Sequence, residues 1–308
     1  MSEEMRQAGH GDAERHHHHS HATTSHHPGG HHLLTVEHLS VSFSMYDTQA
    51  PFFSARHIEH TMISDMSISV HAGEVVAVVG ASGSGKTLLA DALMGLYEPN
   101  AHVEGNIWFD GVLQDATSLA RLRGHGISLV PQSVTHLDPL MPVGEQVLGA
   151  CPRGRAARAE RARRQRRMEE LFATYRLDPS VMRRYPHELS GGMLRRILIM
   201  CALMDDPKLI VADEPTPGLD LDLAVRALGD LRTFANDGGG VMLITHDLEL
   251  ALRVADRVAV FYEGRIVEET ATASFARPDT LEHPFTRALW HALPEHDFCA
   301  VPLSGGEE

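Results

Sequence analysis

One segment constrains the fold of this chain more than any other: Gly80-Ala81-Ser82-Gly83-Ser84-Gly85-Lys86-Thr87, which matches the phosphate-loop pattern G-x-x-x-x-G-K-[S/T] in full. It follows an apolar run at 74–79 and precedes a helical pattern at 88–95. Its glycines let successive backbone N–H groups converge on a phosphate, and the N-terminus of the next helix favours negative charge. The sequence therefore predicts a strand, a phosphate-binding loop and a helix in succession.

Two side chains of this loop have specific expected roles in nucleotide binding. Lys86 is expected to neutralise β- and γ-phosphate oxygens, and the Thr87 hydroxyl is expected to ligate Mg²⁺. Lys86 is one of only two lysines among the 27 lysines and arginines, so a lysine at this position argues against a chance match. The alternative is a glycine-rich turn that binds no nucleotide, and the flanking strand and helix disfavour it. ATP and Mg²⁺ are the predicted cofactors.

Composition restricts the class of protein further. The chain has 308 residues, 43% apolar and 22% charged, as in a globular protein of one large or two small domains. No run reaches the roughly 18–20 apolar residues that cross a bilayer, so the chain is expected to stay in the cytoplasm. Three separated cysteines argue against disulfides and zinc ribbons: Cys151, Cys201 and Cys299. The net charge of −14 disfavours nucleic acid as a partner.

The patterns along the chain divide it into three regions. Residues 1–32 contain ten of the 22 histidines in low-complexity sequence that cannot build a core, and they are predicted to be a disordered tail. Residues 33–270 are predicted to form the main domain. Residues 271–308 are predicted to form a C-terminal extension with a short helical pattern.

Within 33–270, the strand patterns predict two kinds of sheet. Alternating apolar residues at 34–39 and 63–70 are typical of a small antiparallel sheet. Continuous apolar runs predict a parallel sheet covered on both faces, at 74–79, 126–130, 208–212 and 240–245, with a hairpin at 257–269. The predicted fold class is α/β, with a phosphate-loop parallel sheet core and an N-terminal antiparallel β subdomain.

The strand pattern stops between about 132 and 188, where a helical subdomain is predicted to be inserted. Eight arginines fall within 153–167, next to an amphipathic segment at 168–172. A solvated helix face is the usual meaning of such a charge run, and it is favoured here over an RNA-binding surface.

A pair of carboxylates, Asp213-Glu214, ends the apolar run at 208–212. The ends of parallel strands are where α/β proteins bind their ligands. Asp213 is expected to hold Mg²⁺ through its water shell, and Glu214 is expected to act as general base on the attacking water. Taken alone, an acidic pair after a strand is as often the start of a solvated loop, but the phosphate loop favours the catalytic interpretation.

The segment Leu189-Ser190-Gly191-Gly192-Met193 resembles the signature motif of ABC ATPases. Alone it predicts only a helix N-terminus that attracts anions. The resemblance implies the RecA-like core of an ABC nucleotide-binding domain. It also implies that two such domains face each other head to tail, so that Ser190, Gly191 and Gly192 of one chain close over the γ-phosphate held by the other.

Four further residues resemble functional positions of this family by their order along the chain. Gln132 resembles the glutamine that senses Mg²⁺ and water and hinges the helical subdomain. His246 resembles the switch histidine at the γ-phosphate, and Asp220 the acidic residue that communicates across the dimer. Phe43, with Tyr46 as the alternative, is similar to the aromatic residue that stacks on adenine.

Across about 33–290, the chain looks most like the oligopeptide and nickel importer ATPases. The similarity rests on Met193 in the signature, on Leu137-Asp138-Pro139-Leu140-Met141, and on His283-Pro284-Phe285-Thr286-Arg287-Ala288-Leu289. Pro217-Gly218 departs from the small polar residues of the family pattern before Asp220, which leaves the conformation of that loop open.

This resemblance implies partners: a second, different ABC ATPase subunit, two transmembrane permease subunits and an extracellular solute-binding protein. The chain would lie peripherally at the cytoplasmic face of the membrane and hydrolyse ATP to energise uptake. Soluble ABC proteins of DNA repair or translation, and exporter ATPases, are the alternatives. The former usually carry two cassettes, a long coiled coil or zinc-binding insertions, and the latter usually have fused membrane helices; the sequence contains none of these patterns.

Histidine clusters near the N-terminus are the only residue-level indication of cargo. Clustered neutral imidazoles bind Ni²⁺, Zn²⁺ or Co²⁺, and the candidates are His16, His17, His18, His19, His26, His27, His31 and His32. Import of nickel or another transition metal, free or chelated, would give them a role, and oligopeptides are the alternative cargo. An incidental low-complexity segment, an expression tag or a pH-responsive charge patch would also explain these histidines.

Overall fold

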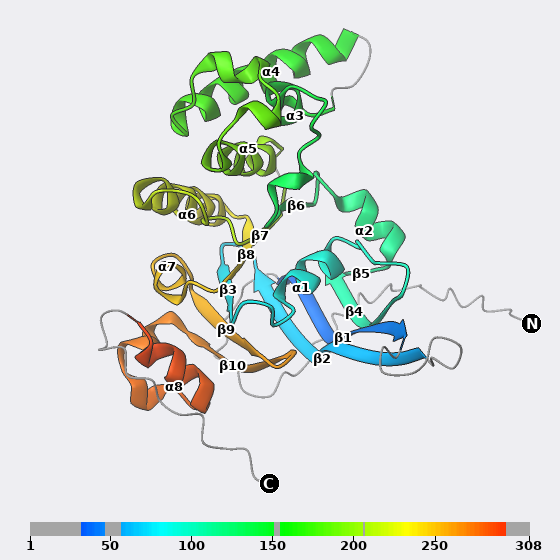
Figure 1. The fold of residues 1–308 in the computed structure, drawn as a ribbon, viewed down its shortest axis with the longest axis vertical. Helices are drawn as coiled ribbons and strands as arrows, with labels where there is room; N and C mark the ends of the chain where they lie inside the picture. Colours follow the sequence, from blue (N-terminus) through cyan, green and yellow to red (C-terminus); the bar gives the residue numbers. More distant parts are fainter. Residues whose placement is uncertain (1–31, 47–56, 151–154, 206, 294–308) are drawn as a thin grey trace, which may run out of the picture.

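The structure is a computed structural model that describes residues 32–46, 57–150, 155–205 and 207–293, with 155–157 described in backbone only. Figure 1 shows helices α3, α4 and α5 at one end of the long axis, two sheets in the middle and helix α8 near the other end. Within the described ranges, no helix is both long enough and apolar enough to cross a membrane.

Four strands form an antiparallel sheet in the order β2-β1-β4-β5: β1 (His32–Tyr46), β2 (His57–His71), β4 (Ala101–Phe109) and β5 (Val112–Gln114). Val36 of β1 pairs with Ile68 on one side and with Ile107 on the other, and all three side chains are buried. The predicted antiparallel β subdomain is confirmed. Because β1 begins at His32, this residue lies in the first strand and not in the predicted tail.

Six strands form the central sheet in the order β10-β9-β3-β8-β7-β6. Their bounds are β3 (Val75–Val79), β6 (Ile127–Val130), β7 (Leu209–Asp213), β8 (Gly240–Thr245), β9 (Arg257–Tyr262) and β10 (Arg265–Ala271). The five strands from β9 to β6 are parallel, and β10 pairs antiparallel with β9. The predicted parallel core and the terminal hairpin are both confirmed.

The central sheet separates two apolar cores, because successive side chains of a strand point to opposite faces. On β3, Val75, Ala77 and Val79 join the core beneath the helices α5, α6 and α7. Val76 and Val78 join the other core, which includes helix α1 and the antiparallel sheet. Burial on both faces explains why the sequence of these strands is continuously apolar.

The helices around the central sheet are short except for one. Their bounds are α1 (Lys86–Leu93), α2 (Ala116–Leu122), α6 (Leu221–Asn236) and α7 (Leu248–Leu252). The longest of them, α6, buries an apolar stripe that includes Leu223, Ala227 and Leu231, at the spacing of one helix face.

The helical subdomain contains α3 (Val143–Leu148) and α4 (Arg155–Thr174), with 3₁₀ turns at Val134–His136, Pro179–Arg183 and Pro186–Glu188. Helix α5 (Gly191–Met204) packs against both helices and against β6, so it joins this subdomain to the central sheet. Five arginines of α4 are exposed, as a solvated face predicts: Arg158, Arg161, Arg163, Arg166 and Arg167. Arg164 is the exception, because its buried guanidinium donates to the Leu148 carbonyl at 2.6 Å and pairs with Asp205.

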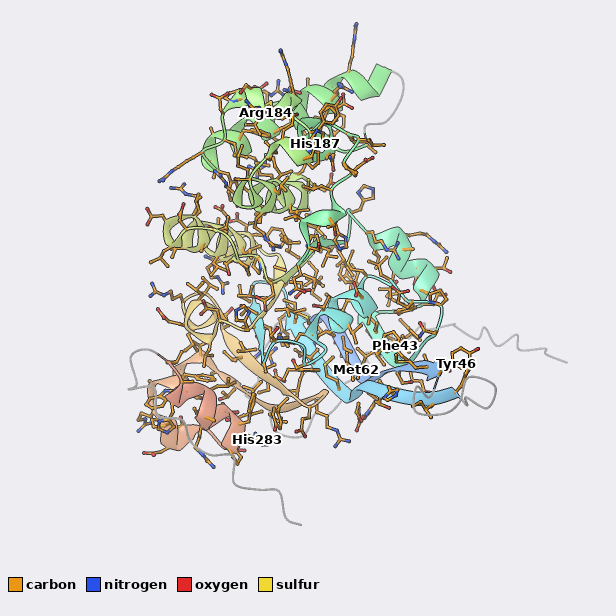
Figure 2. The ribbon with its side chains drawn as sticks, viewed as in Figure 1. Phe43, Tyr46, Met62, Arg184, His187 and His283 are labelled. Atoms are coloured by element: carbon orange, nitrogen blue, oxygen red, sulfur yellow. The ribbon has the colours of Figure 1, made fainter. Side chains whose placement is uncertain are left out.

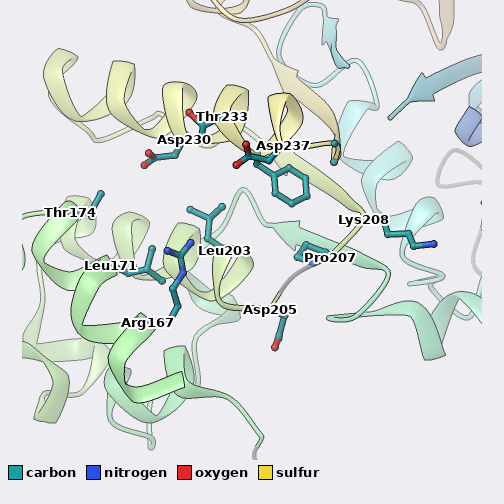
Figure 3. A pocket seen from close by; sticks show the side chains of 13 residues that line it. Arg167, Leu171, Thr174, Leu203, Asp205, Pro207, Lys208, Asp230, Thr233 and Asp237 are labelled. Atoms are coloured by element: carbon teal, nitrogen blue, oxygen red, sulfur yellow. The ribbon is translucent and has the colours of Figure 1, made fainter. Parts of the chain in front are cut away.

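A cavity of about 610 Å³ lies between α4 and α6 (Figure 3). Arg167, Leu171 and Thr174 of α4 line one side of it, and Asp230, Thr233 and Phe234 of α6 line the other. Lys208 and Gly239 lie in the wall just before β7 and β8 begin. The cavity is therefore at the opposite edge of the sheet from the phosphate loop, which follows the carboxyl end of β3.

The C-terminal region folds back on the last hairpin through two 3₁₀ turns (Thr272–Ala276 and Pro278–Thr280) and helix α8 (Pro284–His291). Glu268 of β10 accepts hydrogen bonds from the backbone N–H groups of Glu282 and His283, at 2.9 and 2.8 Å. The rings of Tyr262 and Phe285 lie 4.2 Å apart. These contacts attach α8 to the sheet immediately before the chain leaves the described range.

A buried ion pair connects the two sheets at the start of β3. Arg257 donates to Glu74 at 2.5 and 3.1 Å and to the Ser69 carbonyl at 2.8 Å, and it also pairs with Glu269. Glu74 accepts two further hydrogen bonds from His71. Burial raises the pKa of Glu74, but the hydrogen bonds from His71 and Arg257 and the charge of Arg257 outweigh burial and bring the pKa to about 2.

This shift predicts acid sensitivity. The folded-state pKa of Glu74, about 2, is below its ordinary value of 4.5, so the unfolded chain binds more protons between these values and stability falls as pH falls. The loss of unfolding free energy between pH 7 and pH 3 should be smaller in Glu74→Gln than in wild type by about 2 kcal/mol. Urea unfolding at both pH values measures this difference. Glu249→Gln, at an exposed pair with Arg253, should match wild type; identical pH dependence in Glu74→Gln would contradict the assignment.

Candidate functional site

The phosphate loop connects β3 to α1 and curls around the ammonium group of Lys86. Lys86 is 6% exposed, and its Nζ donates to the carbonyls of Gly80 and Ala81 at 2.9 and 2.7 Å. A Cβ at Gly80 would lie 2.2 Å from the Phe261 carbonyl oxygen of β9, so the loop can pass this strand only as glycine. The predicted strand, loop and helix are present in the predicted order.

The carboxylate pair lies at the end of β7, two strands away from β3 in the sheet. Asp213 is the last residue of β7 and is 2% exposed, while Glu214 follows it and is 6% exposed. Glu214 has a φ of +48°, which is an uncommon conformation for a residue other than glycine, and its N–H donates to the Ile244 carbonyl at 2.8 Å. The neighbouring strand β8 thus holds the backbone of Glu214 in a strained conformation, as often occurs at functional sites.

His246 lies beside this carboxylate. Its Nδ1 is 2.7 Å from Glu214 Oε1, and its side chain is 55% exposed while that of Glu214 is 7% exposed. The two residues are 32 positions apart in sequence, and they meet because β7 and β8 are adjacent parallel strands. The structure therefore brings the predicted general base and the predicted switch histidine into contact.

Gln132 and Thr87 form the second contact of the site. The Thr87 hydroxyl donates to Gln132 Oε1 at 3.2 Å. Gln132 follows β6, which pairs with β7, so the loop after β6 and the phosphate loop meet at the carboxyl edge of the sheet. Thr87, Gln132 and the consecutive pair Asp213-Glu214 are thus brought to one edge by three different segments of the chain.

The electrostatics of the site favour a bound cation. Burial lowers the pKa of Lys86, and the charges of Glu214 and Asp213 oppose this change. Burial also raises the pKa of Asp213 to about 6, with the charges of Glu214 and Asp91 adding to the shift, while a Thr87 hydrogen bond and the charge of Lys86 oppose it. Two carboxylates placed this close together, with one lysine, are more favourable when a divalent cation joins them.

Two orphaned atoms test whether Mg²⁺ and a nucleotide fit. Asp213 Oδ1 and Glu214 Oε2 are buried and have no hydrogen-bond partner within the described part of the chain. A buried carboxylate oxygen without a partner is unfavourable by about 1–3 kcal/mol or more. Metal-bound water at Asp213 and an attacking water at Glu214 would satisfy both atoms. The residues therefore fit ATP with Mg²⁺.

The signature segment begins helix α5. Ser190 is its N-cap, and the hydroxyl accepts a hydrogen bond from the Met193 N–H at 3.4 Å. Gly191 and Gly192 occupy the first positions of the helix. Their predicted contact with a nucleotide involves a second chain and remains a prediction.

The loop before α6 contains Pro217-Gly218, which left its conformation open at the level of sequence. In the structure this loop is a tight turn. The Leu219 N–H donates to the Thr216 carbonyl at 3.1 Å, and Gly218 has a φ of +80°, as in a type II turn with proline at its second position. The turn leads into Asp220, the N-cap of α6, whose Oδ1 accepts from the Leu223 N–H at 2.9 Å. The predicted communication residue is therefore at a helix N-terminus.

This turn also touches the signature segment. A Cβ at Gly192 would lie 2.8 Å from the Gly218 carbonyl oxygen, whereas a Cβ at Gly191 would meet nothing within 4 Å. Gly192→Ala should therefore lower the unfolding free energy by about 1–3 kcal/mol, because backbone must shift. Gly191→Ala should be neutral or stabilising by up to about 1 kcal/mol, because alanine favours helix. Thermal unfolding of both variants measures the contrast, and equal melting temperatures would contradict the close approach.

The candidate adenine-stacking residues lie on β1, where Phe43 is the one nearer to Met62 of β2 and Tyr46 pairs with His57 (Figure 2). Phe43 is half-buried against the core, whereas Tyr46 is 67% exposed with its ring 4.3 Å from that of His57. Met62, which the sequence did not single out, is exposed, and its carbonyl oxygen lies 3.2 Å from where a Cβ on Gly85 would be. The strand β2 therefore borders the phosphate loop, and Phe43 remains the predicted stacking residue.

Most histidines proposed as transition-metal ligands lie outside the described residues: His16, His17, His18, His19, His26, His27 and His31. His32 is in β1, and its ring is 4.4 Å from that of His71. Among the residues that the structure does describe, no group of three or more histidine, cysteine, aspartate or glutamate side chains is placed to hold a metal ion. Binding of nickel, zinc or cobalt by this segment stays a prediction.

Comparisons with known proteins identify the family of the chain. The profile of the family described as "ABC transporter" matches residues 63–217. The oligopeptide transport ATP-binding protein OppD of Lactococcus lactis subsp. cremoris is 38% identical over 240 residues, covering 75% of this chain and 70% of that protein. OppD of Escherichia coli is 35% identical over 272 residues, covering 86% of this chain and 77% of that protein.

Two further similarities extend the comparison. The glutathione import ATP-binding protein GsiA of Shigella dysenteriae is 34% identical over 280 residues, which cover 85% of this chain and 42% of that protein. Among solved structures, the ATP-binding cassette MJ0796, a dimer in a post-hydrolysis state bound to ADP and phosphate, has a TM-score of 0.64 at 25% identity. That similarity covers 78% of this chain and 98% of the cassette.

Proposed function

This chain belongs to the ABC transporter family, as an ATP-hydrolysing subunit of the oligopeptide and nickel importer group, and from that membership we propose that it energises solute uptake through separate membrane subunits. One observation carries the proposal: Lys86 and Thr87, Gln132, and the Asp213-Glu214 pair come from three segments and converge at one edge of the sheet. Such convergence suits phosphoryl transfer, where catalysis is mainly positioning and electrostatic stabilisation.

Each residue has a role in this proposal. The phosphate loop, with Ser82, Gly83, Ser84 and Gly85, holds the phosphates through backbone N–H groups, and Lys86 neutralises their charge. Thr87, Gln132 and Asp213 would hold Mg²⁺, and the ion would supply charge neutralisation to the phosphates when bound. Phe43 stacks on adenine.

Glu214 takes a proton from the attacking water. The water oxygen bonds to the γ-phosphorus, and the bond from that phosphorus to the oxygen bridging to the β-phosphate breaks. His246 holds Glu214 Oε1 at 2.7 Å, which leaves Oε2 available to the water. The signature segment of a second ATPase completes this site, and Ser190, Gly191 and Gly192 of this chain complete the site of that second ATPase. Asp220 connects the two sites.

The proposed assembly contains this chain, a second and different ABC ATPase, two transmembrane permease subunits and an extracellular solute-binding protein. The chain sits peripherally on the cytoplasmic face of the membrane. ATP-driven closure of the two ATPases moves the membrane subunits through the helical subdomain and the loop at Gln132. Support comes from the contact of that loop with Thr87 and from its position between β6 and the helical subdomain.

Two cargo classes are proposed in order. Short peptides come first, because the similar proteins OppD and GsiA are named for oligopeptide and glutathione import. A transition metal such as nickel, free or chelated, comes second, and the ten histidines in residues 1–32 favour it.

Uptake in cells distinguishes these classes. Cells with wild-type protein, Lys86→Ala or the control Lys208→Ala are given a labelled oligopeptide and, separately, labelled nickel. Lys208 is exposed and pairs with Asp110, away from the phosphate loop. If Lys86→Ala loses peptide uptake and Lys208→Ala does not, the result supports a peptide importer. If Lys86→Ala loses nickel uptake and Lys208→Ala does not, the result supports a transition-metal importer. If Lys86→Ala takes up both the peptide and nickel at the wild-type level, the importer proposal is contradicted for these cargoes. An exporter or a soluble ABC ATPase would then be favoured.

A further inference from the structure

Arg195 is a buried charge in the middle of the molecule. It lies on α5, is 7% exposed, and its two terminal nitrogens donate to the backbone carbonyls of Pro131 at 2.8 Å and Gln132 at 2.6 Å. The fork of the guanidinium thus holds two successive peptide groups of the loop after β6. A planar fork with fixed geometry restrains this backbone more closely than a single hydrogen bond.

The charge of Arg195 is influenced by the two carboxylates of the candidate site. Burial lowers its pKa, and the charges of Asp213 and Glu214 oppose this change. Its third nitrogen, Nε, is buried and has no hydrogen-bond partner within the described part of the chain. If Arg195 had a purely structural role, all of its N–H donors would be expected to form hydrogen bonds, because an unpaired buried donor is unfavourable.

Arg195 also shares a helix with the signature segment. Helix α5 starts after its N-cap, Ser190, and five residues of α-helix span about 7–8 Å. Gln132, at the other end of the clasp, receives the hydrogen bond from Thr87. A continuous chain of contacts therefore runs from Ser190 along the helix to Arg195, and from there through Gln132 to Thr87 in the phosphate loop.

We infer that Arg195 is a positioning residue: it ties the Gln132 loop to the start of α5, so that engagement of Ser190 by the opposing nucleotide sets the position of Gln132 at the chain's own site. The inference rests on the proposed roles of Gln132 and Ser190. It assigns the link between the two nucleotide sites to a side chain that touches neither nucleotide. Because a rigid helix and a two-pronged clasp form this link, displacement at one end is transmitted to the other.

The chain offers a matched control. Arg123 also clasps two successive carbonyls, those of Met94 at 2.7 Å and Gly95 at 2.8 Å, at the far end of α1. Lysine keeps the charge at either position but cannot donate to both carbonyls in the same plane. Arg195→Lys and Arg123→Lys therefore remove the same kind of clasp, and they differ in whether Gln132 is attached.

The test measures ATP hydrolysis, with its Mg²⁺ dependence, by the assembled complex that purifies with the full chain and contains the second ATPase. Arg195→Lys should lower kcat about 10-fold or more with KM for ATP within about 2-fold, since misplacement of a positioned group mainly affects the reacting complex. Arg123→Lys should stay within about 2-fold of wild type. In a Gln132→Ala background, which keeps the backbone carbonyl but removes the side chain, Arg195→Lys should lower kcat by less than about 2-fold further.

Several outcomes would overturn the inference. Equal losses in Arg195→Lys and Arg123→Lys would indicate a general effect on stability, and so would failure of both Arg195→Lys and Arg195→Gln to fold. An undiminished Arg195→Lys effect in the Gln132→Ala background would show that Arg195 does not act through Gln132, with the proposed function intact. Full activity of Gln132→Ala itself would instead reject the proposed role of Gln132.

Discussion

Glu214→Gln should lower kcat for ATP hydrolysis by about 10²–10⁴-fold and leave the affinity for ATP within a few-fold of wild type. The amide has nearly the shape of the carboxylate, so it can keep the hydrogen bond to His246, which is 2.7 Å from Oε1 in the wild-type protein. It cannot accept a proton from water. Because binding of the phosphates depends on Lys86 and backbone N–H groups, removing the base affects turnover and spares binding.

Phosphate release measures turnover, and a fluorescent ATP analogue with Mg²⁺ measures binding. Glu249→Gln is the control, since Glu249 is an acidic residue of the nearby helix α7 that pairs with Arg253 at the surface; it should hydrolyse ATP at the wild-type rate. Hydrolysis at the wild-type rate by Glu214→Gln would remove Glu214 from the role of general base. Loss of binding together with turnover would place Glu214 in nucleotide binding.

Lys86→Ala should weaken ATP binding by about 10²-fold or more, equivalent to about 3 kcal/mol. Two effects add. The variant loses the ammonium group that would neutralise the phosphates, and it loses the two hydrogen bonds to the Gly80 and Ala81 carbonyls that hold the loop curled before nucleotide arrives. The ordering of the loop is then left to the nucleotide, which reduces affinity further.

Titration with a fluorescent ATP analogue measures the change in dissociation constant. The other lysine of the chain is the control: Lys208→Ala removes a surface pair with Asp110 and should bind ATP as wild type does. A melting temperature close to that of wild type for Lys86→Ala would assign the loss to the site. An unchanged dissociation constant would contradict the role of Lys86.

The fold was predictable to the extent that its signals were local. The apolar run at 240–245 coincides with β8, and the run at 74–79 differs from β3 by one residue. Strand limits in the antiparallel sheet were not predictable. The strands β1 and β2 continue through polar residues such as Ser42 and Glu59, because pairing between β1, β2 and β4 satisfies their backbone groups regardless of side-chain pattern.

The candidate site was predictable as a set of residues and not as a set of contacts. Lys86 and the Asp213-Glu214 pair stand in recognisable local patterns: Lys86 begins the helix after the phosphate loop, and the carboxylate pair is found where β7 ends. No comparable sequence pattern singles out Arg195. An arginine within a helix is expected to be exposed, and only the structure shows that this position of α5 is buried. Its neighbour Arg196 illustrates the ambiguity, since it also binds backbone carbonyls, but of Gly192 and Tyr175.

The sequence by itself determined the chemistry that the chain can perform. A phosphate loop between a strand and a helix, two carboxylates after a strand and a capped glycine pair depend on residues that are neighbours in the chain, so local stereochemistry specifies them. Tertiary structure alone decided which of these groups meet. Thr87 and Gln132 are 45 residues apart, Glu214 and His246 are 32 apart, and Arg195 and Gln132 are 63 apart. The parallel pairing of β6, β7 and β8 and the packing of α5 on β6 bring these residues together although they are far apart in sequence. Burial of apolar side chains across the whole sheet stabilises that arrangement.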